Sequence, residues 1–503
     1  MNKIGCLFSV TIFYLLSFSL NINYAHASEI YVGKASVDIT PPLPVALDGQ
    51  FHTRVANKAD NPVTANILIL SAGSKNNSAE TSIMVSCDLV GISPLILKGV
   101  RDFVSNNLPG VDPGKVMISA THTHTGPVVQ MDMSAIPYLI PEGVTSPAQA
   151  LEFIVKSINN GIMQAWKNQQ KATVTWGIDH AKVAYNRRAS YDDGSAKMYG
   201  NTAVKEFRKI EGPEDESINS LFFWNTKGEL MVACINIACP AQIVEGRNTV
   251  NADFWHFVRR NMQQRWGKQL VVLGWTGAAG DQSPRPMYQK AAELRMTQLR
   301  SSIAPENIKL NNTDFQTENY LQEIAGRITD AVVRSYEAVK ADKHPDVAVK
   351  HTVTKIDLPM RIISEKEYWE IKHDIANHSA TPEEARKNYG RINWNQGALD
   401  RYKNQLTVEK PVYETEVQVL RIGDVAICTN PFELYTDYGV QMKARSKALQ
   451  TFVLQLTGRG TYLPTKAAVK GGHYSATPQS NMVGPEGGQM LVERTVQLIN
   501  ELW

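Results

Sequence analysis

The alternation of strand-like runs with helical patterns is the feature that most constrains the fold of this 503-residue chain. Short apolar runs predict strands at 66–70, 82–87, 115–119, 221–224, 230–237, 270–274, 416–421, 425–428 and 451–456. Amphipathic patterns predict helices at 94–107, with Ser93 as its N-cap, and at 147–167, 254–266, 314–339, 365–376 and 433–446. Strands separated by helices indicate an α/β fold with at least one buried sheet.

The first 27 residues have the features of a secretory signal peptide. A short cationic start is followed by an apolar run at 7–20 and by Ala25-His26-Ala27, a small-x-small cleavage signal before Ser28. We therefore predict cleavage after Ala27 and a periplasmic or secreted protein. The run is short for a membrane span, so no stable membrane anchor is expected, with a retained N-terminal anchor as the alternative.

Residues 28–503 are predicted to form a single domain, because no repeat, low-complexity tract or Pro/Gly-rich linker divides them. The net charge of +3 gives no electrostatic footprint for nucleic acid. Four cysteines follow the signal peptide, each in an apolar, strand-like run: Cys87, Cys234, Cys239 and Cys428. We expect small buried hydrophobes and a fold that does not depend on disulfides. The oligomeric state cannot be predicted from the sequence.

Two histidines stand at the end of a predicted strand. The stretch "ISATHTHTGPV" places His122 and His124 directly after the run at 115–119. In α/β folds functional residues collect where strands end and loops begin, so this pair is a candidate site. The alternative is a pair of hydrogen-bonded structural histidines. Further along, Ser283 in "GDQSP" belongs either to the same pocket or to an Asp-capped turn.

Several motifs carry a resemblance when they are read in order. They are "KASVDITPP" (34–42), "SATHTHTGP" (119–127), "YNRR" (185–188), "NADFW" (251–255), "GAAGDQSPR" (277–285), "TNPFELYTDYG" (429–439) and "GTYLPT" (460–465). Together they resemble the neutral/alkaline, non-lysosomal ceramidase family. The resemblance implies an α/β, ceramidase-like catalytic domain with mixed sheets and flanking helices. The sequence leaves no room for the C-terminal β-sandwich of that family, so we expect that part to be lacking.

The same resemblance implies a zinc ion that activates water for attack on an amide. His122 and Glu433 would be ligands, and His124 would lie near the reacting carbonyl. Such N/O ligation is typical of catalytic zinc, which takes three or more protein ligands and keeps one open position. Glu433 also has a simpler interpretation as an acidic residue at the N-terminus of the predicted helix 433–446.

Two of the implied ligands are replaced in this chain. The second family histidine corresponds to Cys239 or Pro240 in "INIACPAQ" (235–242), and Cys239 could still ligate zinc as a thiolate. The family tyrosine corresponds to Arg459 when "TGRGTYLPT" (457–465) is aligned on Tyr462. A guanidinium cannot bind a cation. The sequence thus predicts either no cofactor or a degenerate zinc site of His122, Glu433 and Cys239.

The remaining polar groups favour an anionic substrate, because Arg459 can pair with a carboxylate and offset the charge of a developing enolate. The predicted catalytic residues are His122, His124, Ser283, Arg459 and Tyr462, with Arg188, Arg247 and Arg285 as substrate-binding residues. A weaker resemblance is to ceramidase-related oligosaccharide dehydratases of ulvan degradation. We therefore predict an exported lyase that eliminates water from a uronic acid of an anionic oligosaccharide. The alternatives are a zinc-dependent amidohydrolase that cleaves an N-acyl bond and a catalytically inactive binding protein.

Overall fold

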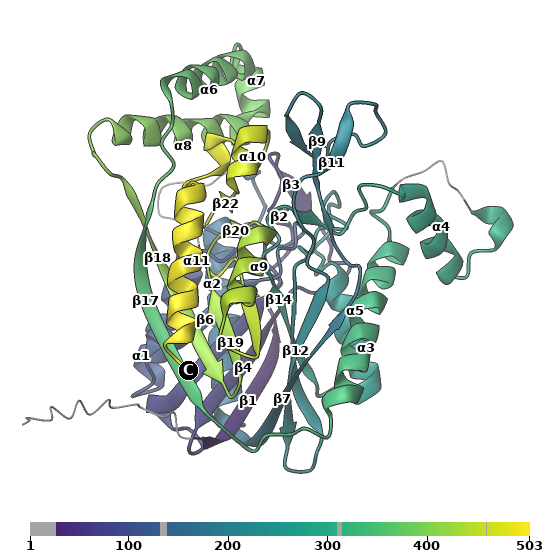
Figure 1. Cartoon of the computed structure of the whole chain (residues 1–503), viewed down its shortest axis with the longest axis vertical. Coiled ribbons are helices and arrows are strands. Elements are labelled where there is room, and N and C mark those ends of the chain that lie inside the picture. The colour runs from purple at the N-terminus through teal and green to yellow at the C-terminus, as the bar shows by residue number, and fades with distance from the viewer. Residues whose placement is uncertain (1–26, 131–137, 309–313, 459) are drawn as a thin grey trace, which may run out of the picture.

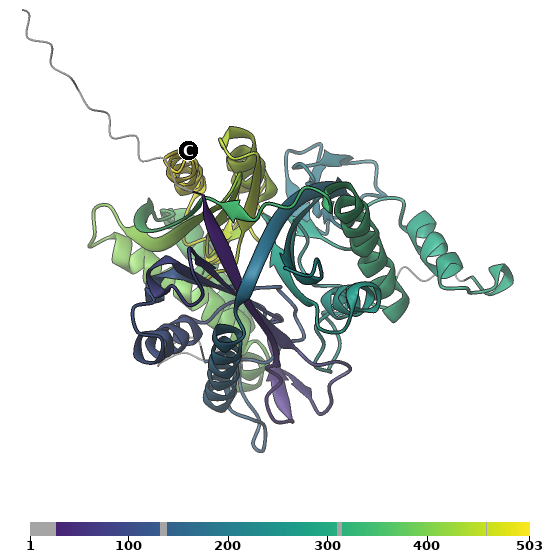
Figure 2. The same ribbon diagram turned by 90° about the horizontal axis from the view of Figure 1, so that it is seen from below.

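The computed structural model describes residues 27–130, 138–308, 314–458 and 460–503. The predicted signal peptide up to His26 and the predicted catalytic Arg459 lie outside the described residues. Two β-sheets face each other at the centre, and helices cover their outer faces (Figures 1 and 2). The predicted α/β class with mixed sheets and flanking helices is confirmed.

The larger sheet has nine strands in the order β14-β13-β12-β7-β1-β4-β5-β6, with β16 paired to β1. Its strands are β1 (Ser28–Asp38), β4 (Thr64–Ala72), β5 (Thr81–Cys87), β6 (Val116–Ala120), β7 (Gln170–His180), β12 (Ser217–Asn225), β13 (Leu230–Ile237), β14 (Val271–Thr276) and β16 (Asp346–Val347). Most neighbours are antiparallel, but β5/β6 and β13/β14 are parallel pairs at the two ends of the sheet.

The smaller sheet runs in the order β17-β18-β19-β21, with β17 (Val349–Pro359), β18 (Val412–Ile422), β19 (Val425–Thr429) and β21 (Gln450–Leu454). Its last pair, β19/β21, is parallel. The chain leaves this sheet between β17 and β18 to form α6 (Glu365–His378), α7 (Pro382–Lys387) and α8 (Tyr389–Gln405), which stand at the top of Figure 1. This helical excursion forms part of the candidate site described below.

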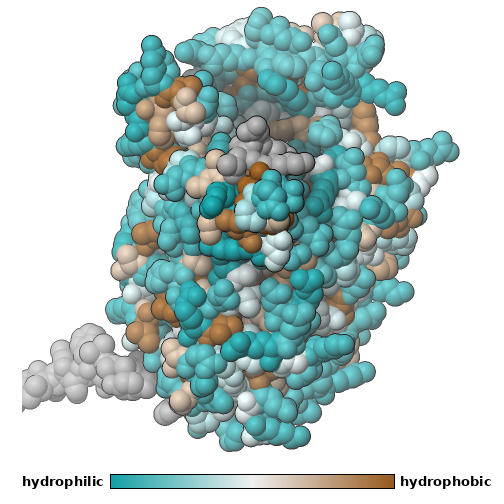
Figure 3. Space-filling view, turned by 90° about the vertical axis from the view of Figure 1, so that its right-hand side faces the viewer, coloured by the Kyte–Doolittle hydropathy of each residue, from teal (hydrophilic) through white to brown (hydrophobic). Residues whose placement is uncertain are grey.

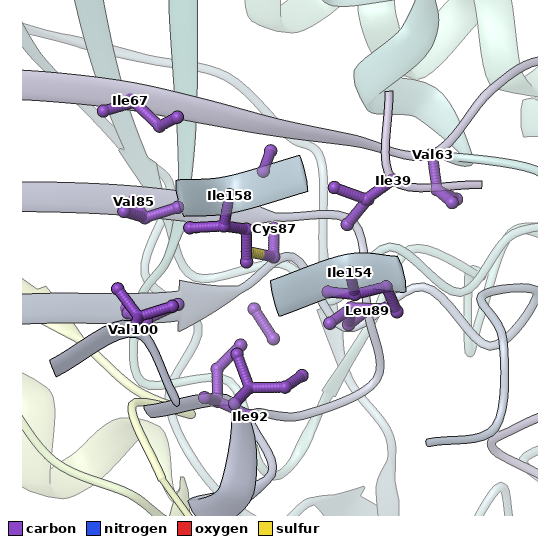
Figure 4. Close-up of a cluster of buried hydrophobic side chains, with 14 of the residues drawn as sticks. Ile39, Val63, Ile67, Val85, Cys87, Leu89, Ile92, Val100, Ile154 and Ile158 are labelled. Carbon is purple, nitrogen blue, oxygen red and sulfur yellow. The ribbon is translucent and has the colours of Figure 1, made fainter. Parts of the chain in front are cut away.

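The core follows from strands that are buried on both faces. In β4, Ile67 and Ile69 pack in the cluster under α1 (Pro94–Asn107) and α2 (Pro147–Lys167), part of which Figure 4 shows. The intervening Leu68 and Leu70 point to the opposite face, where they meet Phe452 and other side chains of the smaller sheet. Because strand side chains alternate between faces, a continuous apolar run such as β4 fits a strand covered on both sides.

The remaining helices complete two further core clusters. Helices α3 (Phe254–Trp266) and α5 (Glu318–Val339) cover the β12-β13-β14 end of the larger sheet, and α9 (Thr436–Arg445) and α11 (Pro485–Asn500) cover the smaller sheet. The other elements are β2 (Val45–Leu47), β3 (Arg54–Ala56), β8 (Tyr185–Asn186), β9 (Arg188–Tyr191), β10 (Ala196–Met198), β11 (Phe207–Ile210), β15 (Gln282–Ser283), β20 (Glu433–Leu434), β22 (Tyr462–Leu463), α4 (Lys290–Arg300) and α10 (Lys466–Gly471).

Several predicted elements can be compared directly with this fold. The helices at 94–107, 147–167 and 254–266 begin and end as predicted, and the Ser93 hydroxyl caps the first by accepting from the backbone N–H of Leu95 at 3.2 Å. The helix predicted at 433–446 begins only at Thr436, because Glu433 and Leu434 form the short strand β20 paired with β22. The four cysteines that follow the predicted signal peptide are buried and free, as expected.

One face of the molecule carries its apolar side chains in small groups (Figure 3). On the face shown in Figure 3, hydrophobic residues form separate patches among hydrophilic ones. Among the described residues, no helix combines the length and the apolar character that crossing a membrane requires.

Candidate active site

The loops that follow the strands of three parallel pairs, β5/β6, β13/β14 and β19/β21, meet at one place. In the loop after β6, the Thr121 carbonyl oxygen accepts a hydrogen bond at 3.1 Å from the backbone N–H of Ala241, which lies in the loop after β13. Gly280 N, in the loop after β14, donates to Leu434 O, which follows β19, at 2.8 Å. Leu456, which follows β21, accepts from Ala120 N at 3.3 Å. Through these contacts the loops meet and form the wall of one site.

His122 is held in a strained, fixed position. Its φ of 66° lies in the left-handed region, which a non-glycine residue adopts at an energetic cost and often at functional sites. Its backbone N–H donates to Leu89 O at 2.9 Å, and its Nδ1 donates to Val90 O at 2.6 Å. The Nδ1 proton directs the other ring nitrogen, Nε2, to a point 3.4 Å from Oε2 of Glu433. His122 Nε2 is therefore placed to exchange a proton.

His124 is fixed as a neutral ring. The side-chain oxygen of Gln242 accepts a hydrogen bond from Arg187 at 3.3 Å, which turns the NH2 group of the same amide toward His124. This NH2 group donates to His124 Nε2 at 2.6 Å. Burial, helped by the charges of His122 and Arg187, holds the pKa of His124 well below its usual value. The ring packs against Gly49, where a Cβ would lie 2.4 Å from His124 Cγ. His124 therefore serves as a positioned, uncharged neighbour of His122 Nε2, 3.4 Å away.

A second row of polar residues is linked to His124 through Gln242, which bonds to both His124 and Arg187. Arg187 is buried and donates to Tyr199 Oη at 2.9 Å and to Tyr462 Oη at 3.4 Å. The Tyr199 hydroxyl donates to Ser283 Oγ at 3.3 Å, and its ring lies 5.0 Å from the guanidinium of Arg285. Burial would raise the pKa of Tyr199, but the charges of Arg187 and Arg285 outweigh it and lower the pKa to about 7.

A cavity of about 770 Å³ opens in front of these groups. His122, His124, Glu433 and Tyr462 line its floor, and Trp394 of α8 lines the side contributed by the helical excursion. The volume is in the range of pockets that bind small ligands. Four of the residues implied by the family motifs are thus brought together around one cavity.

Other predicted residues lie beside or away from this cavity. Ser283 and Arg285 belong to the second row, where Arg285 forms an ion pair with Glu245. Arg188 is fully buried, pairs with Glu211 and donates to backbone carbonyls of the segment 468–474, so its contacts are those of a structural residue.

Arg247 also lies apart from the cavity. It pairs with Asp60 at 3.3 Å in a partly exposed position. Four further residues of the site were not predicted from the sequence: Arg187, Tyr199, Gln242 and Glu245. The only sequence signal for Arg187 is the "YNRR" motif, in which the neighbouring Arg188 is the predicted substrate-binding residue.

The three predicted zinc ligands do not come together, because Cys239 lies apart from His122 and Glu433. Cys239 lies in the core cluster under α3 and α5, where its Sγ donates to Val183 O at 3.2 Å, and burial holds the pKa of this thiol well above its usual value. His122 and Glu433 are left without a third ligand of the predicted set. In the described part of the chain, no three His, Cys, Asp or Glu side chains form a group that could hold a metal ion. The donor set does not fit a zinc site with three protein ligands.

Tyr199 provides a direct test of the electrostatics of the second row. Because its pKa is lowered to about 7, the phenol should lose its proton as the pH rises from about 6 to about 8, whereas ordinary tyrosines ionise near 10. Ultraviolet titration of the parent should therefore show one early tyrosinate step that is missing in Tyr199→Phe. If the two proteins titrate identically in this range, the proposed influence of Arg187 and Arg285 is wrong.

The chain is similar to known proteins in its structure but not in its sequence. No protein-family model matches the chain, and no curated protein matches its sequence. The crystal structure of neutral ceramidase from Pseudomonas aeruginosa is similar, with a TM-score of 0.66 at 16% identity, over 94% of this chain and 74% of that chain. A structure described as ceramidase complexed with C2 is similar with a TM-score of 0.63 at 14% identity. The chain therefore has the fold of the neutral ceramidases.

Proposed function

We propose that the protein is a metal-independent acid–base enzyme that eliminates water from a uronic acid unit of an anionic oligosaccharide. One observation carries this proposal: His122 and Tyr462 line the same cavity, whereas Cys239, which would complete a metal site, lies in the core. A base and an acid that share a cavity are what an elimination requires. Export through a signal peptide, to the periplasm or the medium, belongs to the same proposal.

In the proposed step, His122 Nε2 removes the proton from the carbon next to the substrate carboxylate. The electron pair forms a C=C bond, the neighbouring C–O bond breaks, and the hydroxyl leaves as water with a proton from Tyr462. Burial, together with the charge of Glu433, keeps the pKa of Tyr462 well above its usual value, so Tyr462 holds its proton until the step occurs. Glu433, 3.4 Å from His122, then returns the proton from His122 to Tyr462.

Charge stabilisation comes from two arginines in this proposal. Arg187 lies 3.4 Å from the Tyr462 oxygen and offsets the negative charge that develops there. Arg459 pairs with the substrate carboxylate, although it lies outside the described residues. A planar guanidinium is well suited to a carboxylate because the two groups can form two parallel hydrogen bonds.

Amide hydrolysis of the ceramidase type is the second candidate. It is favoured by the fold likeness and by the convergence of His122 Nε2 and Glu433 Oε2, which correspond to two of the ligands implied by the family motifs. This candidate needs further ligands from residues other than Cys239. The two functions make different products, so a single assay can separate them.

The test is incubation with a uronate oligosaccharide and with its carboxyl-reduced counterpart, followed by mass spectrometry and ultraviolet absorbance. We expect the acid to lose one water and to gain the near-ultraviolet absorbance of a conjugated double bond, and the reduced sugar to remain unchanged. Release of an amine and a fatty acid from an N-acyl lipid, with no change in the oligosaccharide, would instead support the second candidate.

A further inference from the structure

A second cavity adjoins the first across an aromatic wall. Its volume is about 930 Å³, and Phe51, Trp394 and Tyr474 line both cavities. The ring centroid of Phe51 lies 5.4 Å from that of Trp394 and 6.0 Å from that of Tyr474. The same three rings would therefore contact a ligand bound in either cavity.

The second cavity is built largely from the helical excursion. Residues of α6, α7 and α8 form one side, and the segment 469–479 forms the other. In Figure 1 these helices stand above β20 and β22, which carry Glu433 and Tyr462. A ligand that extends from the first cavity past the three aromatic rings would therefore enter the second cavity, which α6, α7 and α8 help to line.

The charges of this cavity leave one cation without a partner. Its three carboxylates are all paired: Glu367 with Arg361 at 3.1 Å, Asp374 with Arg391 at 2.6 Å, and Glu370 with Lys366 at 3.8 Å. Lys387, at the end of α7, is exposed and forms no ion pair or hydrogen bond within the described parts of the chain. The lining of the cavity thus includes both a free ammonium group and aromatic rings.

We propose that this second cavity is a subsite for the next sugar unit of an acidic oligosaccharide, with an aromatic face against the sugar ring and Lys387 near its carboxylate. The inference rests on the proposed function, since it places the terminal unit between His122 and Tyr462. Aromatic rings bind the apolar faces of ring-shaped ligands, and an ammonium supplies charge without fixing a single geometry. The volume is ample for one such unit.

The experiment compares an acidic disaccharide with an acidic tetrasaccharide of the same sugars. Binding is measured by calorimetry on the His122→Asn protein, in which turnover should be too slow to disturb the signal, with and without Lys387→Ala. We expect the tetrasaccharide to bind more tightly than the disaccharide, and Lys387→Ala to reduce this advantage about two- to fivefold, as for an exposed ion pair. Disaccharide binding should not change.

Arg386→Ala is the matched control, because Arg386 precedes Lys387 in α7, is exposed, and does not line the cavity. Equal effects of the two variants, equal affinity for both sugars, or no binding of either sugar would overturn the subsite. Failure of the proposed function has a different signature: the active protein would leave the oligosaccharide intact, while the Lys387-dependent preference for the longer sugar would persist.

Discussion

Replacing His122 with asparagine is expected to lower the turnover of an acidic oligosaccharide by about 10²–10⁴-fold, the usual cost of removing a positioned acid or base. Asparagine is chosen because it tolerates the left-handed backbone that His122 adopts, with a φ of 66°. The substitution removes Nε2, which faces Glu433 at 3.4 Å, and leaves no group that can accept a proton at that point. The measurement is the rate of elimination at saturating substrate.

His373→Ala on α6 is the control for this substitution, since His373 is exposed and lies outside the first cavity. The control should keep the parent rate, and the thermal midpoints of both variants should stay close to that of the parent. Turnover within about threefold of the parent in His122→Asn would remove His122 from the chemistry.

Arg259→Ala is expected to lower the free energy of unfolding by about 3–5 kcal/mol, because it leaves a buried carboxylate without its partner. Arg259 donates to both oxygens of Asp88, at 2.7 and 2.9 Å, and the Asp88 side chain is fully buried. Asp88 also accepts from the backbone N–H of Thr64 and from the Thr121 hydroxyl, next to His122. The pair therefore fixes the strand end from which the site is built.

Urea denaturation measures this effect, and Arg260→Ala provides the matched control. Arg260 is the next residue of α3, is exposed, and its guanidinium lies 4.7 Å from the ring centroid of Phe257. Its replacement should change stability by no more than about 1 kcal/mol. Similar losses for the two variants would show that the buried pair with Asp88 does not carry the stability assigned to it.

The elements that were predictable from sequence are those that carry their own boundary signals. Helices α1 and α2 each begin at a proline preceded by a capping serine, and α3 begins after Asp253, whose carboxylate accepts from Phe254 N at 2.9 Å. Such signals are local and depend on few residues. The α/β class followed from the same alternation of elements.

Elements that depend on distant partners were not predictable in this way. Glu433 and Leu434 read as the start of a helix, but they pair with Tyr462 and Leu463, which are brought beside them only by the fold. Strand β17 is long and mostly polar, and it forms because β18 pairs with it along its whole length. Pairing between segments so far apart leaves no local signal.

The candidate site, like the fold, could be predicted from the sequence only in part. The motifs identified His122, His124, Glu433 and Tyr462. The fold brings these four residues to one cavity, because each follows a strand that ends there. They could not show that Cys239 turns away toward Val183, since a cysteine in an apolar run fits both a ligand and a core residue. The orientation of a side chain depends on its packing, so it cannot be predicted from the local sequence.

Metal-independent elimination is tested by measuring turnover of a uronate oligosaccharide after exhaustive chelation of the protein, with zinc content determined in the same sample. We expect loss of water from the sugar to continue at the rate of untreated protein while zinc is well below one ion per chain, because the step uses His122 and Tyr462. If chelation abolishes turnover and added zinc restores it, or if only an N-acyl substrate is cleaved, the metal-independent elimination proposed for this site is contradicted.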